Sequence, residues 1–234
     1  MWVYGTHAVV AALNNPKRKV TRICVTGNEA ENIRSAIDKA RHPKWDIVDN
    51  KQLASLLKHD AVHQGVAIEV EPLPSVSLDE VLAGAETPVV ILDQITDPHN
   101  VGAILHSAAA FDACAIVMQD RHSPALGGAL AKAACGAVEC VPIIEVNNIA
   151  KALDRIKQAN YWVAGLDGNT DTEFGNAKLD KKTALVLGAE GKGLRRLVRE
   201  HCDVLVRLPL SEKMESLNVS NAAAVALYAL YSSS

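Results

Sequence analysis

The sequence is poor in aromatic residues and has no long apolar run. Aromatic side chains make up 4% of the 234 residues, although hydrophobic residues make up 49%. The core must therefore be built from aliphatic side chains and alanine, and alanine-rich stretches of this kind favour closely packed helices. No stretch approaches the roughly 18 consecutive apolar residues of a membrane-spanning helix, so we expect no membrane partner.

Cysteine is also sparse, and its positions show no spacing that suggests disulfide bonds or a metal site. The five cysteines are odd in number and form no C-x-x-C pair, which is typical of thiols kept reduced rather than of a disulfide framework. The N-terminus lacks the basic segment and apolar core of a secretory signal. We therefore expect a cytoplasmic protein. The eight histidines are scattered, and without ligand spacing they predict no metal site.

A strong excess of positive charge is lacking as well, because the net charge is −3. This balance argues weakly against a nucleic-acid partner. It is uneven, however, since residues 1–71 carry ten Lys and Arg against eight Asp and Glu. The overall charge therefore leaves RNA binding undecided, and only a local basic surface could provide it.

Two prolines within residues 71–75 mark a boundary, because proline disfavours both helix interiors and central strands. We predict a small α/β domain at 1–71, a linker at 72–87 and a second domain at 88–234. In the second domain, short apolar runs alternate with helical segments, which is typical of an α/β fold with a mostly parallel sheet. Ligands bind to such sheets beyond the carboxyl ends of the strands.

The first suggestive segment, 92–107, contains a strand end, a polar turn and the start of a helix. Pro98 and Asn100 explain the turn, and Asn100 is expected to cap the helix. Taken alone, the segment could be a capped turn with no further function. Asn100 and His106 are six residues apart, nearly two helical turns, so both side chains could lean toward one side.

The second segment, 187–194, follows a strand and opens a helix. Its three glycines within six residues let the backbone approach a ligand closely or adopt a positive φ. It lacks the Lys-Ser/Thr of a phosphate-binding P-loop and the spacing of a dinucleotide fingerprint. The basic residues Lys192, Arg195 and Arg196 could form a solvated helix face or a patch that contacts phosphates.

The third segment, 208–221, joins a strand end, a polar loop and the start of an alanine-rich helix. Ser216, Asn218 and Ser220 gather where a helix N-terminus leaves backbone N–H groups unpaired. One such side chain is enough for a helix cap. The surplus therefore favours a loop that contacts a ligand.

In this order, the three segments resemble the motifs of the SpoU/TrmH family of RNA ribose 2′-O-methyltransferases. Residues 100–107, 187–194 and 216–220 resemble the first, second and third motif, and the match covers roughly residues 88–231. The resemblance implies a methyltransferase that uses S-adenosylmethionine and RNA and requires no metal.

Two segments near the N-terminus resemble the substrate-binding domain of the RlmB-like branch of this family. They are residues 3–9 (Val-Tyr-Gly-Thr-His-Ala-Val) and 63–67 (His-Gln-Gly-Val-Ala). Members of that branch methylate a guanosine of large-subunit rRNA. The resemblance therefore favours 23S rRNA as the substrate over tRNA.

The resemblance also implies a fold and a cofactor site. The family's catalytic domain contains a deep trefoil knot, and the second and third motifs meet there around the cofactor. The family forms homodimers, and the interface helps to complete the active site. Carried over by position, the residues expected to contact or lie near the cofactor are Leu187, Gly188, Gly191, Leu208, Pro209 and Leu217.

Methyl transfer to a ribose hydroxyl needs the oxygen aligned with the methyl carbon and a group that helps to remove its proton. The resemblance implies that Asn100 and Asn218 position ribose or cofactor groups. Glu190 could orient His106 or the RNA, or be a surface acid. Ser216 could bond to substrate or cofactor, or simply cap a helix. Lys192, Arg195 and Arg196 would contact RNA phosphates, so that Arg195→Ala should reduce the salt dependence of RNA binding.

His106 occupies the position of a family arginine that is thought to assist deprotonation. Arginine stays protonated and offers a planar fork, whereas a neutral imidazole can accept a proton near neutral pH. Two hypotheses remain open: His106 is the general base, or the lost arginine weakens catalysis and leaves an RNA-binding ribosome-assembly factor. A histidine that only packs on its helix is a further alternative. A nucleotide-binding α/β protein without an RNA role is disfavoured by the missing phosphate motifs.

Overall fold

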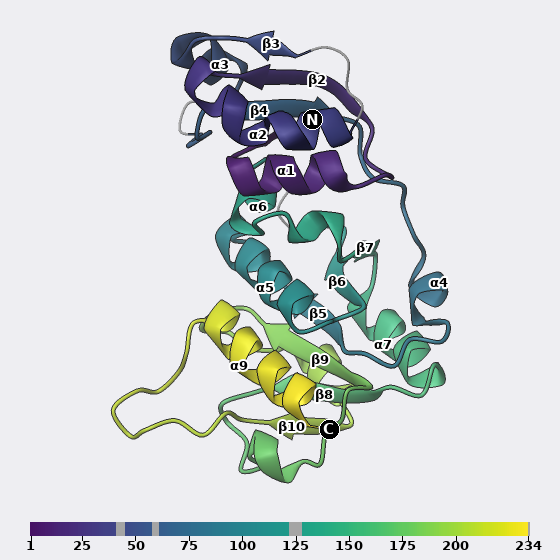
Figure 1. Ribbon diagram of the computed structural model, residues 1–234. Helices are drawn as coiled ribbons and strands as arrows, with labels where there is room; N and C mark the ends of the chain where they lie inside the picture. Colours follow the sequence, from purple (N-terminus) through teal and green to yellow (C-terminus); the bar gives the residue numbers. More distant parts are fainter. Residues whose placement is uncertain (41–44, 58–60, 122–127, 234) are drawn as a thin grey trace. The chain divides into compact units, whose positions relative to one another are not determined.

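The computed structural model describes residues 1–40, 45–57, 61–121 and 128–233. The chain forms two compact units, each made of two pieces of sequence. Unit 1 comprises Met1–Ser75 and Ala125–Cys140, and unit 2 comprises Val76–Pro124 and Val141–Ser234. Figure 1 follows the chain through the elements of both units.

Unit 1 is built on a four-stranded sheet in the order β1-β4-β2-β3. Strand β4 pairs antiparallel with both of its neighbours, and β2 pairs parallel with β3. The strands are β1 (Trp2–Tyr4), β2 (Val20–Val25), β3 (Asp46–Ile47) and β4 (Val66–Val70). The helices from the first piece of sequence are α1 (Thr6–Asn14), α2 (Gly27–Lys39) and α3 (Asn50–Leu56).

Both faces of this sheet are covered, because successive side chains of a strand point to opposite faces. Ile23 and Val25 of β2 are buried in one apolar cluster together with Val9 of α1 and Ile33 of α2. Cys24 lies between them in sequence and belongs to a second cluster, with Leu53 of α3 and Ala67 of β4.

The segment 125–140 adds α6 (Gly128–Ala133) and the 3-10 turn η1 (Ala137–Glu139) to unit 1. Ala131 is part of the unit's apolar core. Gly136 has a φ of 91°, and a Cβ there would lie 2.5 Å from Cβ of Ala11 in α1, so only glycine fits. The compact units thus differ from the predicted domains in this segment, which the sequence assigned to 88–234. The functional domain boundaries stay a prediction.

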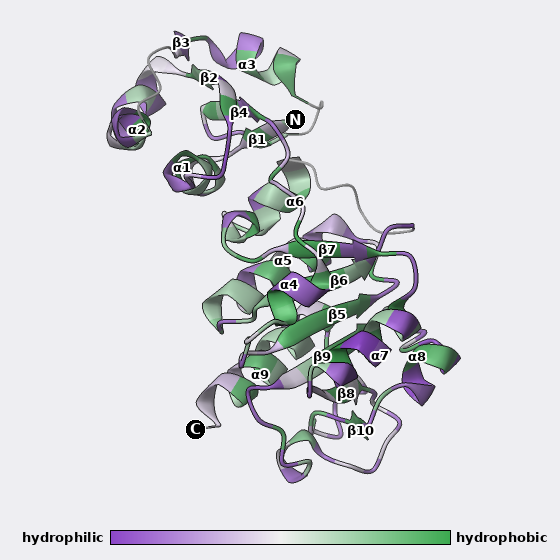
Figure 2. Cartoon of the chain, turned by 90° about the vertical axis from the view of Figure 1, so that its right-hand side faces the viewer, coloured by the Kyte–Doolittle hydropathy of each residue, from purple (hydrophilic) through white to green (hydrophobic). Residues whose placement is uncertain are grey.

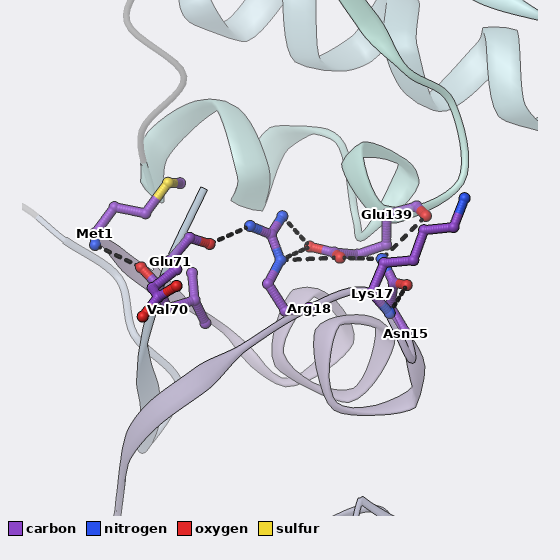
Figure 3. Close-up of polar contacts among 7 residues, drawn as sticks. All are labelled: Met1, Asn15, Lys17, Arg18, Val70, Glu71 and Glu139. Carbon is purple, nitrogen blue, oxygen red and sulfur yellow. Dashed lines mark hydrogen bonds and ion pairs between the residues drawn. The ribbon is translucent and has the colours of Figure 1, made fainter. Parts of the chain in front are cut away.

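A buried ion pair holds this segment in unit 1 (Figure 3). A guanidinium nitrogen of Arg18 lies 2.7 Å from Oε1 of Glu139, and the two side chains are only 2% and 5% exposed. Nδ2 of Asn15 donates to Oε2 of Glu139 at 2.8 Å. Nη1 of Arg18 donates to the carbonyl of Glu71, also at 2.8 Å. These hydrogen bonds offset the cost of removing both charges from water.

We expect Glu139→Gln to lower the free energy of unfolding of unit 1 by about 3 kcal/mol, because Arg18 would stay buried without its counter-charge. Glu71→Gln is the matched control, since its ion pair with Lys19 is 71% and 49% exposed and exposed pairs contribute about 0–1 kcal/mol. Urea unfolding of both variants measures the difference. Equal losses would contradict a special role for the buried pair.

Unit 2 is built on a six-stranded sheet in the order β10-β8-β9-β5-β6-β7, and every pairing in it is parallel. The strands are β5 (Val89–Asp93), β6 (Ala115–Gln119), β7 (Ile143–Val146), β8 (Trp162–Leu166), β9 (Thr183–Gly188) and β10 (Val204–Val206). The helical elements are α4 (Leu78–Leu82), α5 (Pro98–Ala110), α7 (Ile149–Gln158), η2 (Phe174–Asn176), α8 (Arg196–Glu200) and α9 (Val219–Ser232). The predicted α/β fold with a mostly parallel sheet is confirmed, while the trefoil knot stays a prediction.

Helices cover both faces of this sheet, as its buried and largely apolar central strands require. Figure 2 shows α5 and α9 on one side of the strands and α7 and α8 on the other. Every residue of β5 is buried. Within the described residues, no helix is long and apolar enough to cross a membrane.

Candidate active site

The pairing of β5 with β9 brings the first and second motifs to one edge of the sheet. Asp93 at the end of β5 is the register partner of Gly188 at the end of β9. Helix α5 begins shortly afterwards at Pro98, and its cap is Asp97, whose side chain accepts from the N–H of His99 at 3.0 Å. The prediction that Asn100 caps this helix was therefore wrong. Pro98 occupies the first helical position, where its missing N–H and fixed φ are tolerated.

The glycine-rich turn 188–193 brings two stretches of backbone into close contact. The N–H of Gly193 donates to the carbonyl of Ala189 at 2.8 Å. A Cβ on Gly188 would lie 2.3 Å from the carbonyl carbon of Gly193. No residue larger than glycine therefore fits at position 188. Gly191 has a φ of 74°, and nothing lies within 4 Å of the place where its Cβ would be. The backbone of the turn is thus open to a ligand at Gly191.

A hydrogen-bonded cluster joins all three motifs. Oε1 of Glu190 accepts from Nδ2 of Asn100 at 3.1 Å and from Nδ2 of Asn218 at 2.6 Å. Nδ2 of Asn218 also donates to Oδ1 of Asn100 at 3.1 Å. The first pair is separated by 90 residues along the chain and the second by 28. The cluster is solvent-accessible, since Glu190 and Asn218 are exposed and Asn100 is half-buried.

Asn218 is fixed at both ends of its amide group. It is the N-cap of α9, and its Oδ1 accepts from the N–H of Ser220 at 2.9 Å and from the hydroxyl of Ser220 at 2.6 Å. Its amide nitrogen is thereby aimed at Glu190. Ser216 is exposed in the loop before the helix, so capping does not explain it, and its predicted contact with substrate or cofactor stays a prediction.

His106 lies on the exposed side of α5, outside the cluster. Six helical residues turn a side chain by about 600°, which leaves His106 about 120° away from Asn100 around the helix axis. Within the described parts of the chain, the His106 side chain has no hydrogen bond or ion pair. Of the alternatives for Glu190, a contact with His106 is not seen among the described residues; Oε1 of Glu190 binds the two asparagines.

The residues predicted to hold the cofactor flank the ends of β9 and β10. Leu187 is buried in β9, and Gly188 and Gly191 belong to the turn. Leu208 and Pro209 follow β10, and Leu217, which is 37% exposed, precedes α9. These positions agree with ligand binding beyond the carboxyl ends of parallel strands. Their contacts with the cofactor stay a prediction.

The three basic residues predicted to contact RNA have different surroundings. Lys192 is exposed in the turn. Arg196 pairs with Glu200, and both side chains are well exposed, at 77% and 51%. The Nε of Arg195, by contrast, donates to Oδ1 of Asp93 at 2.6 Å. Arg195 is thus already committed to a buried carboxylate, a contact that sequence analysis missed because nothing near Arg195 in the sequence signals it.

The thiols of unit 2 are unsuited to nucleophilic chemistry. Burial raises the pKa of Cys202 to about 12 and also raises that of Cys114. Both groups therefore stay protonated near neutral pH. Among the residues that the structure describes, no group of three or more His, Cys, Asp or Glu could hold a metal ion. The groups that the structure brings together here are two amides and a carboxylate, beside the backbone of the glycine-rich turn.

Comparison with known proteins identifies the family. Residues 87–228 match the SpoU rRNA Methylase family, and residues 2–76 match the family described as RNA 2′-O ribose methyltransferase substrate binding. This chain belongs to the SpoU rRNA methylase family. The predicted family membership is thereby confirmed.

Curated relatives of this SpoU protein match it along almost its whole length. It is 38% identical over 232 residues to the 23S rRNA (guanosine-2′-O-)-methyltransferase RlmB of Pseudomonas syringae pv. tomato, which covers 97% of this chain and 93% of that protein. It is 37% identical to RlmB of Escherichia coli K12, with 97% and 96% covered.

The fold is also shared with solved SpoU structures. The SpoU methyltransferase AviRb from Streptomyces viridochromogenes, crystallised in complex with AdoMet, has a TM-score of 0.82 and 22% sequence identity. The superposition covers 99% of this chain and 89% of AviRb. At this identity, the likeness establishes the common architecture of the two proteins.

Proposed function

We propose that this protein transfers the methyl group of S-adenosylmethionine to the 2′-hydroxyl of a guanosine in 23S rRNA. The cluster of Asn100, Glu190 and Asn218 carries the proposal, because it assembles the three motifs at the edge of the sheet where ligands bind. The substrate follows from RlmB relatives that match 97% of the chain and are named for this reaction.

The cofactor site is proposed at the glycine-rich turn and the segments after β10 and before α9. The open space beside Gly191 and the three glycines of the turn suit a ligand that binds to backbone groups. S-adenosylmethionine supplies an electrophilic methyl group when bound. The chain's own residues then have to hold the ribose 2′-oxygen in line with the methyl carbon.

Asn100, Glu190 and Asn218 are proposed to provide that alignment. Oε1 of Glu190 is occupied by the two amides, whereas Oε2 accepts no hydrogen bond from any residue that the structure describes. With the carboxylate fixed through Oε1, its Oε2 can accept a hydrogen bond from an RNA hydroxyl or base. Lys192 and Arg196 are exposed nearby in sequence, and we propose that they contact RNA phosphates.

Mapping of 2′-O-methylated nucleotides in RNA from cells with and without the gene tests the function. We expect one guanosine of 23S rRNA to lose its methyl group, and the wild-type gene to restore it. Asn218→Ala should not restore it, because Glu190 loses a hydrogen-bond donor. Gln158→Ala in α7 is the matched amide control and should restore it fully. A change in tRNA alone would replace the substrate, and unchanged RNA would favour a non-catalytic assembly factor.

We propose His106 as the general base of the reaction, since it is an exposed imidazole on the motif helix α5. The rate of single-turnover methyl transfer measures this role. His106→Arg should lower the rate by about 100-fold, within the usual contribution of a positioned base. A His106→Arg variant with the wild-type rate would contradict this role. A faster His106→Arg variant would show instead that the missing arginine limits the enzyme.

We propose that the enzyme acts in the cytoplasm as a homodimer. An aromatic cluster lies on the outer face of α5 and α9, where the ring of Phe111 is 5.8 Å from Tyr228 and 6.0 Å from Tyr231. Both tyrosines and Val225 are about half exposed, and aromatic residues of this kind are enriched at protein interfaces.

Sedimentation equilibrium should give twice the chain mass of 25.0 kDa, and Tyr228→Glu should shift the protein to the monomer. A monomeric wild type would contradict the dimer.

A further inference from the structure

Asp93 is a fully buried carboxylate at the carboxyl end of the central strand β5. Its side chain is 0% exposed. Among the described residues, only Arg18 and Thr183 are buried polar or charged residues like it. A buried charge is costly unless it is paired and hydrogen-bonded. The position of Asp93, at the edge of the sheet that carries the three motifs, connects it with the site.

Arg195 satisfies both oxygens of this carboxylate. Its backbone N–H donates to Oδ2 at 2.9 Å, and its Nε donates to Oδ1 at 2.6 Å. Arg195 follows the glycine-rich turn by one residue, since Leu194 lies between them. Asp93 therefore binds the chain where it leaves the turn, and its register with Gly188 holds the chain where it enters.

The turn 188–193 is thus held at its base and at its tip. Asp93 holds the base through Arg195 and the pairing with Gly188. Asn100 and Asn218 hold the tip through the carboxylate of Glu190. The open backbone at Gly191 lies between these two sets of contacts in sequence. Its shape depends on both, because glycine itself restricts the chain very little.

We propose that Asp93 and Arg195 are positioning residues for cofactor binding, which fix the backbone of the glycine-rich turn in the shape that S-adenosylmethionine binds. The inference rests on the proposed function, which places the cofactor at this turn. It also gives Arg195 a role other than the predicted phosphate contact, because its Nε and backbone N–H are engaged by Asp93.

Asp93→Asn tests the pair, since asparagine keeps the size of the side chain but removes its charge. We expect the Kd for S-adenosylmethionine, measured by titration calorimetry without RNA, to rise about tenfold. In methyl transfer, the KM for the cofactor should rise while kcat at saturating cofactor changes less than about threefold, because the bound cofactor restores the turn. A general loss of folded protein would instead lower kcat and leave KM unchanged.

Arg195→Gln is the second variant, because its side chain is 38% exposed and the substitution keeps the backbone N–H that binds Asp93. We expect about fivefold weaker cofactor binding and an unchanged slope of RNA affinity against salt. Loss of a phosphate contact would reduce that slope by about one unit, and this result would overturn the assigned role of Arg195.

Asp167→Asn is the matched control. Asp167 is also a nearly buried carboxylate, 7% exposed, and its partner Arg199 lies on α8, outside the turn. Its loss should leave cofactor affinity within about twofold of wild type. An equal effect in this control, or variants of Asp93 and Arg195 that bind cofactor like wild type, would overturn the positioning pair. A wild-type protein that binds no S-adenosylmethionine would overturn the proposed function itself.

Discussion

The hydrogen bonds between the parallel strands β5 and β9 place the first two motifs of the site beside each other. Their register runs from Val89 opposite Ala184 to Asp93 opposite Gly188. Because both strands end at the same edge of the sheet, the motif helix α5 and the glycine-rich turn start beside each other. A shift of this register by one residue would exchange the side chains of β9 between its two buried faces and would move Asp93 away from Gly188.

Much of this arrangement could be predicted from local patterns. Apolar runs that alternate with helical segments predicted the α/β class and the parallel sheet of unit 2, because such strands are buried on both faces. The three motif segments were expected at strand ends, and the structure has them there. Their residue types also pointed to the family, since no single motif was specific but their order along the chain was.

The sequence could not predict contacts that depend on long-range packing. The cluster of Asn100, Glu190 and Asn218 joins residues up to 118 positions apart, and no local signal pairs them. The cap of α5 was misassigned because Asp97 and Asn100 are both good capping residues, and only the observed helix start distinguishes them. The segment 125–140 is alanine-rich. Small apolar side chains can pack equally well against the core of unit 1 or that of unit 2, so the sequence does not indicate which unit the segment joins.

The discontinuity of unit 1 has a consequence for how the chain folds during synthesis. Arg18 and Glu139 are 121 residues apart, so the first 75 residues leave the ribosome before their buried counter-charge exists. At translation rates of about 5–20 residues per second, the time between the synthesis of Arg18 and that of Glu139 is roughly 6–24 s. During it, the nascent sheet lacks α6, and the guanidinium of Arg18 stays hydrated. Unit 1 therefore completes its fold only after strands β5 and β6 of unit 2 have been made.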